Sequence, residues 1–535
     1  MEFLILSSLE KVFSDEKPAS AEYKSFSMFK NERKSFQAAF CTEENCELAV
    51  ELSGELASYS RAYLVKEVPV GNAAFDNSDG YYLRKTSGLY PDYLLPLDGP
   101  FSAEKGKWYS IWVEVVPNGK VGKSEITVKL SDKAEGKISV DVLDCELPDH
   151  EIVYTNWYHS DCICNYYGVE AMSDEYWRIN ENFIKTAADH GMNCILTPVF
   201  TPPLDTKVGG ERTTVQLVKV YRNGRKYRFD FRNLKKWIEM CERCGIRYYE
   251  ISHLFTQWGA KHAPKIIVID KKGREKKAFG WKTRTSSKKY DRFLRAFAKE
   301  LVKFIDENGL RQKCFFHVSD EPHMRHLRVY RKRAKLIREI FAGFTVIDAL
   351  SDFDFYKTGA VTLPIPCEND IDDFAGKVPE LWTYYCCGQG FDNLPNRFIS
   401  MPSLRNRVLG ILLYKYGCKG FLQWGYNFYN SQYSIKPIDP FKVTDAGGGF
   451  PSGDSFIVYP GEKGEVIESL RLKVFYDGFQ DIASLKLLES KIGREKTVEL
   501  IENELVKPLS FTEYPHSNEW ILNLREQINQ KIMES

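Results

Sequence analysis

The sequence predicts a multidomain α/β protein: an N-terminal antiparallel β-sandwich (residues 1–148), a central (β/α)8 TIM-like barrel (149–485) and a helical C-terminal extension (486–535). Three observations predict this fold. Short runs of alternating apolar and polar residues fill the first part, and strands then alternate with long helical segments. The chain of 535 residues is also longer than a domain with a single hydrophobic core usually is. With 43% hydrophobic and 27% charged residues, the chain can bury cores of its own.

The N-terminal part has the pattern of half-buried strands. The runs FLILSSLEKV, SFQAAFC, WYSIWVEVVP and SEITVKLS are separated by Gly, Pro, Asn and Asp, which favour turns. Several short strands of this kind in succession are typical of a sandwich.

The central part repeats strand-then-helix units, which predict a parallel sheet, and its length favours a closed barrel. Barrel strands are expected within 152–159, 192–200, 246–255, 313–323, 344–353, 380–388 and 420–429. Helices are expected within 174–191, 233–245, 286–309 and 468–493, and a hairpin within 213–231 turns at Asn223 and Gly224.

Charge and composition exclude several classes of partner. Lys plus Arg number 74 against 73 Asp plus Glu, so no basic surface for nucleic acid or an anionic membrane is expected. No apolar run approaches the roughly 20 residues needed to span a bilayer, and the N-terminus lacks the pattern of a signal peptide. We therefore expect a cytoplasmic protein whose partner is neutral or small. The sequence leaves open whether it forms a homo-oligomer.

The cysteines and motifs predict neither a metal site nor a cofactor. Thirteen scattered Cys indicate free, mostly buried thiols in a reducing compartment. Cys241 and Cys244 have zinc-like spacing, but no second pair follows them. A cation near Asp348, Asp352 and Asp354 is a weaker alternative to solvated or capping carboxylates. Phosphate-loop, H-E-x-x-H and G-x-S-x-G motifs are missing from the sequence.

Asp320 and Glu321 are the candidate catalytic pair. In the segment HVSDEPH (317–323) they follow an apolar strand and precede Pro322. Neighbouring side chains of a strand point to opposite faces, so both acids reach one ligand only if the backbone leaves the strand there. Two close carboxylates with different pKa values suit cleavage of a glycosidic bond. The alternative is that Asp320 caps a helix and Glu321 is solvated.

Polar and aromatic residues recur at the other predicted strand ends, where a barrel builds its active face. Aromatic rings cover the apolar face of a sugar, and amides and acids hold its hydroxyls. Taken alone, a His or Trp at such a position is more often a buried core residue than a ligand contact. The candidate substrate-binding residues are Trp157, His253, Trp258, Asp348, Tyr384, Tyr385, Trp424 and Asn427.

The chain resembles glycoside hydrolase family 123, the β-N-acetylgalactosaminidase-like proteins. The resemblance runs from NERKSFQAAF through EISHLFTQWGAKHAPK and SDEP to LQWGYNFYNS and FPSGDSFIVYPG. It implies a retaining, substrate-assisted mechanism in which the 2-acetamido oxygen of the sugar attacks the anomeric carbon. Asp320 would then orient the acetamido group, and Glu321 would protonate the leaving oxygen and later activate water.

We therefore expect an exo-β-N-acetylhexosaminidase that prefers β-linked N-acetylgalactosamine in a small glycoside or oligosaccharide. Two alternatives stay open: a glycosidase for another sugar without acetamido participation, and a non-catalytic carbohydrate-binding protein. The aglycone is not fixed by the sequence.

Overall fold

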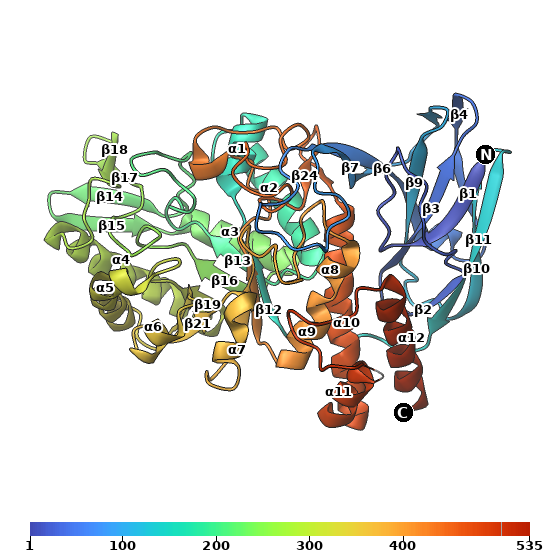
Figure 1. Cartoon of the computed structure of the whole chain (residues 1–535). Coiled ribbons are helices and arrows are strands. Elements are labelled where there is room, and N and C mark those ends of the chain that lie inside the picture. The colour runs from blue at the N-terminus through green and yellow to red at the C-terminus, as the bar shows by residue number, and fades with distance from the viewer. Residues whose placement is uncertain (504) are drawn as a thin grey trace.

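The N-terminal β-rich region consists of two sheets that share one apolar core. The computed structural model describes residues 1–503 and 505–535. One sheet has the order β1-β3-β9-β6-β7 and is antiparallel throughout, and the other has the order β2-β11-β10-β5. Phe36 and Ile111 from the first sheet meet Ile126 and Val140 from the second in this core. Figure 1 shows this region at one end of the molecule.

The strands of this region follow the alternation of the sequence. Their bounds are β1 (Glu2–Ser7), β2 (Ser25–Phe29), β3 (Lys34–Cys41), β4 (Cys46–Leu48), β5 (Val50–Ser53), β6 (Ser60–Val70), β7 (Gly88–Pro96), β8 (Phe101–Ala103), β9 (Trp108–Val115), β10 (Gly122–Leu130) and β11 (Ala134–Leu143).

The central sheet has eight parallel strands in the order β21-β20-β19-β16-β13-β12-β23-β22. An isolated bridge between Cys367 and Tyr384 links its two edges, so the barrel is nearly closed. This confirms the predicted parallel barrel. The strands are β12 (Val153–Asn156), β13 (Cys194–Thr197), β16 (Tyr248–Ile251), β19 (Cys314–Phe316), β20 (Thr345–Ala349), β21 (Leu363–Ile365), β22 (Trp382–Tyr384) and β23 (Gly420–Gln423).

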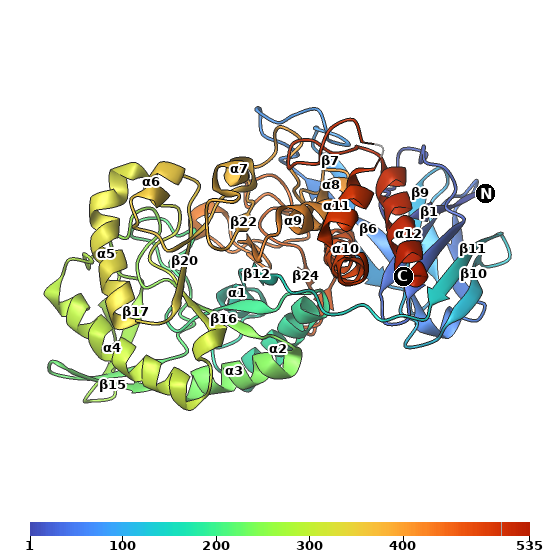
Figure 2. The same ribbon diagram turned by 90° about the horizontal axis from the view of Figure 1, so that it is seen from below.

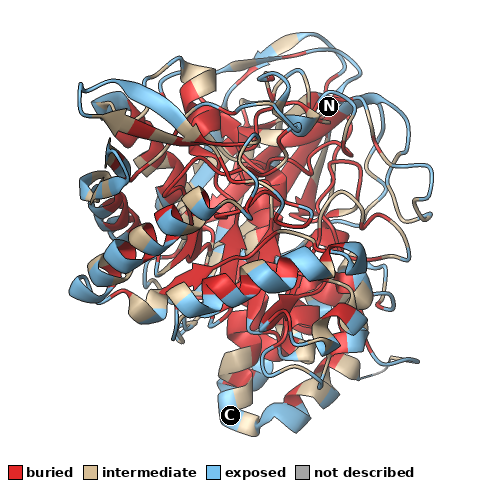
Figure 3. Ribbon diagram, turned by 90° about the vertical axis from the view of Figure 1, so that its left-hand side faces the viewer, coloured by how far each residue is buried: buried red, intermediate tan, exposed pale blue. Residues whose placement is uncertain are grey.

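Helices follow the barrel strands and surround the sheet, as Figure 2 shows for α2 to α5. They are amphipathic or apolar segments, and Figure 3 shows buried residues gathered toward the strands and exposed ones on the outer helix faces. Their bounds are α1 (Ser160–Tyr167), α2 (Asp174–Asp189), α3 (Arg232–Cys244), α4 (Lys288–Glu307), α5 (Leu327–Ile340), α6 (Phe353–Lys357), α7 (Ile371–Phe374), α8 (Ser403–Arg407), α9 (Leu409–Tyr416) and α10 (Leu470–Ile492).

Side chains fill the interior of the barrel. Trp382 from β22 is buried there beside Phe315, with ring centroids 5.6 Å apart. Gly420 of β23 lies so close to Trp382 that an added Cβ would fall 2.0 Å from its ring. Only glycine fits there, and the filled interior leaves the strand ends as the place for a ligand.

Two hairpins on the side of the barrel form a further sheet, in the order β15-β14-β17-β18. The predicted hairpin at Asn223 and Gly224 is confirmed as β14 (Lys219–Asn223) and β15 (Lys226–Asp230). The second hairpin, β17 (Ile266–Asp270) and β18 (Glu275–Phe279), was not predicted. It carries the long segment between β16 and α4 outward from the barrel.

The last helices join the barrel to the N-terminal region. Besides α10 they are α11 (Arg494–Glu502) and α12 (Asn518–Glu534). Helix α10 is continuous, so a boundary at residue 485 would fall inside it. None of the helices in the described parts of the chain is long and apolar enough to cross a membrane.

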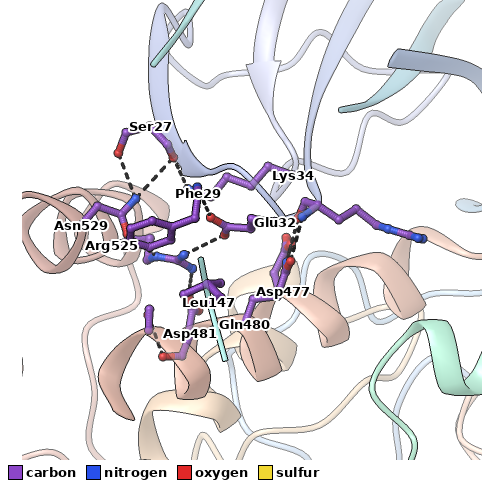
Figure 4. A network of polar contacts seen from close by, with 12 residues as sticks. Ser27, Phe29, Glu32, Lys34, Leu147, Asp477, Gln480, Asp481, Arg525 and Asn529 are labelled. Carbon is purple, nitrogen blue, oxygen red and sulfur yellow. Dashed lines mark hydrogen bonds and ion pairs between the residues drawn. The ribbon is translucent and has the colours of Figure 1, made fainter. Parts of the chain in front are cut away.

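Buried ion pairs hold α12 against both neighbours (Figure 4). The guanidinium of Arg525 donates to Glu32 at 2.7 Å and to Asp481 of α10 at 2.8 Å. Asp481 also accepts from Arg407 of α8 at 2.8 Å. All four side chains are buried, so the charges depend on each other for compensation.

Candidate active site

Asp320 and Glu321 reach one cavity because the backbone departs from the strand before them. Strand β19 ends at Phe316, and Glu321 has a positive φ of 43°. That left-handed conformation is costly for a residue with a side chain and is typical of functional sites. Both residues are half-buried and line the same cavity.

The cavity lies at the carboxyl ends of the barrel strands and is mainly aromatic and apolar. It also carries acids, an amide and two thiols. Its lining residues are Trp157, Leu204, Asp205, Gln257, Trp258, Asp320, Glu321, Ala349, Tyr384, Cys386, Cys387, Leu422, Trp424 and Phe450.

Tyr384 positions Glu321. Its hydroxyl donates a hydrogen bond to Oε1 of Glu321 at 2.7 Å. Burial raises the pKa of Tyr384 well above its ordinary value, so the hydroxyl remains a donor across the physiological range. Tyr384 ends β22 and is therefore fixed by the sheet.

Asp320 retains a proton more strongly than an ordinary aspartic acid. Burial, followed by the neighbouring Glu321, raises the pKa of Asp320 well above its usual value. The raised pKa of Asp320 means that this carboxyl group holds its proton to a higher pH than an isolated Asp does.

A buried chain of charges lies beneath the pair. His317 is 2.6 Å from Glu250 through Nε2 and 3.7 Å from Asp348 through Nδ1. Burial alone would lower the pKa of His317, but the two carboxylates outweigh it and raise that pKa to about 9. An imidazolium between two carboxylates is therefore the state at neutral pH.

Asp348 fixes the backbone that leads into the pair. Its Oδ1 accepts the backbone N–H groups of Val318 at 2.9 Å and Ser319 at 3.0 Å. The Tyr330 hydroxyl donates to its other oxygen. Asp348 was predicted to bind substrate, but the structure places it beneath the cavity and not on its wall.

The loop after β16 is held against Asp320. The N–H of Trp258 donates to the carbonyl of Asp320 at 3.0 Å, and the N–H of Ala260 donates to Oγ of Ser319 at 3.1 Å. Trp258 and Ala260 have positive φ angles of 57° and 53°. Gly259 between them cannot be replaced without strain, because its φ is 108° and a Cβ would lie 2.6 Å from the ring of His326.

Two tryptophans of the wall are oriented by buried carboxylates. The indole N–H of Trp157 donates to Glu250 at 2.7 Å, and that of Trp424 donates to Asp454 at 2.9 Å. Burial raises the pKa of Asp454 to about 7. The ring orientations are therefore set from behind the cavity wall.

The structure divides the ten predicted site residues into two groups. Those on the cavity wall are Asp320, Glu321, Trp157, Trp258, Tyr384 and Trp424. Those buried behind it are His253, Asp348, Tyr385 and Asn427. Asn427 accepts the N–H of His159 at 2.8 Å, and Tyr385 packs against Phe421.

Asp205 is a wall residue that the strand-end pattern missed. It lies eight residues beyond β13, whose last residue is Thr197, and no local signal marks it. Its N–H donates to the amide oxygen of Gln257 at 2.7 Å, and its Oδ2 accepts the N–H of Tyr433 at 2.9 Å. Burial raises the pKa of Asp205 to about 6. Gln257 is a further wall residue that was not among the predicted binding residues.

The acidic loop after β20 is explained without a cation. Asp352 caps α6 by accepting the N–H of Phe355 at 2.8 Å, and Asp354 pairs with Lys357 at 2.5 Å. Within residues 1–503 and 505–535, no group of three or more His, Cys, Asp and Glu side chains is placed to hold a metal ion.

Comparison with known proteins identifies a family and a similar solved structure. Residues 157–488 match the catalytic domain of glycoside hydrolase 123. A family 123 glycoside hydrolase from Clostridium perfringens, whose structure was analysed for the details of glycolipid glycan hydrolysis, aligns with a TM-score of 0.75 at 16% identity. The alignment covers 100% of this chain and 99% of that one.

More distant structures share less of the architecture. A xyloglucanase from Bacteroides ovatus aligns over 85% of this chain and 98% of its own at 10% identity, but its TM-score is only 0.28. No curated protein matches the chain.

Proposed function

The chain belongs to glycoside hydrolase family 123 and is a glycosidase, and from this premise we propose that it is a retaining, substrate-assisted exo-β-N-acetylhexosaminidase that prefers β-linked N-acetylgalactosamine. The observation that carries the proposal is the meeting of Asp320 and Glu321 at one cavity, with Tyr384 hydrogen-bonded to Glu321.

In the first step the 2-acetamido oxygen of the sugar attacks the anomeric carbon. Asp320 accepts the acetamido N–H and so orients the attacking oxygen. Glu321 gives its proton to the glycosidic oxygen, and the aglycone leaves. The product is an oxazolinium-like intermediate made from the substrate alone, so the enzyme supplies no nucleophile.

In the second step Glu321, now ionised, takes a proton from water. The hydroxyl attacks the anomeric carbon from the face that the aglycone left, which restores the acetamido group and retains the configuration.

We assign the remaining wall residues to binding of the sugar. Trp157, Trp258 and Trp424 supply rings for its apolar faces, while Asp205 and Gln257 supply polar atoms for its hydroxyls. The four buried residues His253, Asp348, Tyr385 and Asn427 support the wall from behind.

A matched pair of chromogenic β-glycosides, one with and one without the 2-acetamido group, tests the mechanism. Substrate assistance predicts turnover of the first and loss of turnover with the second. Equal rates would favour a glycosidase without acetamido participation. Binding of both sugars without hydrolysis of either would favour a carbohydrate-binding protein.

An apolar aglycone fits the rim of the cavity. Four large apolar side chains lie exposed there or in the adjoining loops: Val208 (72%), Ile435 (65%), Tyr433 (40%) and Trp258 (39%). The N–H of Lys207 donates to the carbonyl of Tyr433 at 2.9 Å, which places Val208 beside that loop, and Tyr433 packs edge-on to Trp258. Exposed apolar residues gathered beside a site mark an interaction surface. We propose that the lipid part of a glycolipid contacts this rim.

A further inference from the structure

Two adjacent thiols line the sugar cavity. Cys386 and Cys387 follow the last residue of β22, Tyr384, after one intervening residue, and both face the cavity. Neither is in a disulfide, and both are half-buried. The proposed hydrolysis uses neither of them.

The backbone around the two thiols is fixed. The N–H of Cys386 donates to the amide oxygen of Gln389 at 2.9 Å, and its carbonyl accepts from the amide nitrogen of Asn396 at 2.9 Å. Asn396 is itself fully buried. These hydrogen bonds hold both cysteines at the cavity wall, where the Cys386 thiol also donates to the amide oxygen of Gln389 at 3.4 Å.

The Cys386 thiol lies beside that of Cys387 and holds its proton firmly. The neighbouring Cys387 thiol, and then burial, raises the pKa of Cys386 well above its ordinary value. A direct disulfide between them would be strained, because neighbouring Cα atoms are about 3.8 Å apart and disulfides usually join Cα atoms about 4.4–6.8 Å apart. A larger atom placed between the two sulfurs avoids that constraint.

We propose that Cys386 and Cys387 form a binding site for a trivalent, thiol-seeking metalloid of the organoarsenical class, in the wall of the sugar cavity. Two S–H bonds and the arsenic–oxygen bond of an arsine oxide break, and two arsenic–sulfur bonds form. The oxygen leaves with both protons as water. Arsenic stays trivalent, so the step needs no oxidant or reductant.

Occupation of this site blocks the proposed catalytic centre. Cys386 is two residues from Tyr384, whose hydroxyl is bonded to Glu321, and all three line the same cavity. An arsenical with an aryl group therefore takes up space that the sugar needs. The second arsenic–sulfur bond forms within one molecule. The affinity of the two thiols together should therefore exceed that of a single thiol by about 10²–10⁴-fold.

The chain provides a matched control pair. Cys241 and Cys244 are separated by one helical turn on α3, but both are buried and neither lines the sugar cavity. One thiol of each pair donates a hydrogen bond: Cys244 to the carbonyl of Glu181 at 3.7 Å, and Cys386 to the amide oxygen of Gln389 at 3.4 Å. We therefore expect the arsenical to bind Cys386 and Cys387 and not Cys241 and Cys244, because only the first pair is accessible from the cavity.

The test uses the full chain and phenylarsine oxide at one equivalent, with intact-mass measurement after an excess of a monothiol. We expect one arsenical per chain. It should be lost in both Cys386→Ser and Cys387→Ser and kept in Cys244→Ser. A dithiol should remove it from the wild type. Thermal melting of each variant shows whether it folds.

Retention of the arsenical by folded Cys387→Ser, or no arsenical on the folded wild-type chain, would overturn the proposal. The labelling needs no turnover, so it stands apart from the hydrolase proposal. If the wild type hydrolyses a glycoside, we also expect one equivalent of the arsenical to abolish that activity. A dithiol should restore the activity, and a monothiol should not. Full activity of the labelled chain would refute the blocking of the cavity.

Discussion

His253 stacks on His317, with ring centroids 4.0 Å apart and ring planes inclined by 19°. The pKa values of the two rings are nevertheless shifted in opposite directions. Burial, and then the charge on His317, lowers the pKa of His253 well below its ordinary value, whereas Glu250 and Asp348 hold the pKa of His317 at about 9. One neutral and one charged imidazole thus form the support beneath the candidate catalytic pair.

This arrangement predicts a pH dependence of stability. The pKa of His317 rises from 6.5 in the unfolded chain to about 9 on folding, so the folded state binds the extra proton. The resulting stabilisation, roughly 3 kcal/mol, is fully present below pH 6.5 and is lost as the pH rises through 9. Denaturant unfolding of the wild type and of His317→Asn between pH 6 and about 10 measures it. The variant should show the smaller decline, and exposed His323→Asn should match the wild type.

Removal of the proposed general acid should reduce turnover strongly. We expect Glu321→Gln to lower kcat on an unactivated glycoside by about 10²–10⁴-fold. A good leaving group should restore part of the rate, because it departs without a proton. Asp320→Asn should lose activity with both kinds of leaving group. Steady-state kinetics with a nitrophenyl and an alkyl glycoside decide this, and unchanged rates in Glu321→Gln would exclude its role.

Tyr384 and Tyr385 offer a matched pair of variants. Tyr384→Phe deletes the hydrogen bond to Glu321, and a net loss of about 1.4 kcal/mol corresponds to a tenfold fall in kcat. The hydroxyl of Tyr385 is buried without a partner, so Tyr385→Phe should leave kcat unchanged. Equal effects of the two substitutions on kcat would show that the hydrogen bond does not matter.

The rim should discriminate between aglycones. Wild-type kcat/KM should be higher for an octyl than for a methyl β-glycoside of N-acetylgalactosamine, because the chain buries apolar surface on the rim. Ile435→Ser and Val208→Ser should lower the octyl value several-fold and spare the methyl value. Exposed Val506→Ser, outside the rim, is the control. A constant octyl-to-methyl ratio would mean that the aglycone does not touch these residues.

The buried ion pairs at α12 should control stability and not catalysis. Arg525→Met leaves the carboxylates of Glu32 and Asp481 short of a partner, which costs about 3–5 kcal/mol. Arg178→Met removes an exposed pair with Glu175 and should cost under about 1 kcal/mol. Urea denaturation measures both, and kcat of folded Arg525→Met at low temperature should equal that of the wild type.

The barrel and the acidic pair were predictable because their signals are local. An apolar strand that runs into Asp320, Glu321 and Pro322 can be recognised in seven residues. Strand β21 was not predicted, because its three residues include Pro364, which argues against a strand. The β17–β18 hairpin was also missed, since its apolar run lies within a long connection after β16.

The orientation of side chains was the less predictable part of the site. His253 and Asp348 lie at or near strand ends, as expected, but both pack beneath the cavity. The ring of His253 stacks on His317, and Asp348 accepts the backbone N–H of Ser319. Asp205 lies in a loop, and its hydrogen bonds to Gln257 and Tyr433 hold it at the cavity wall. Such placement depends on contacts between distant segments, which no single stretch of sequence reveals.

The ion pair between Glu32 and Arg525 joins residues 493 positions apart. A ribosome that adds about 5–20 residues per second makes the arginine roughly 25–100 s after the glutamate. During that interval the carboxylate of Glu32 has no guanidinium to pair with. The N-terminal sheets therefore complete this attachment only after residue 525 has been made, and until then the Glu32 carboxylate depends on water for solvation.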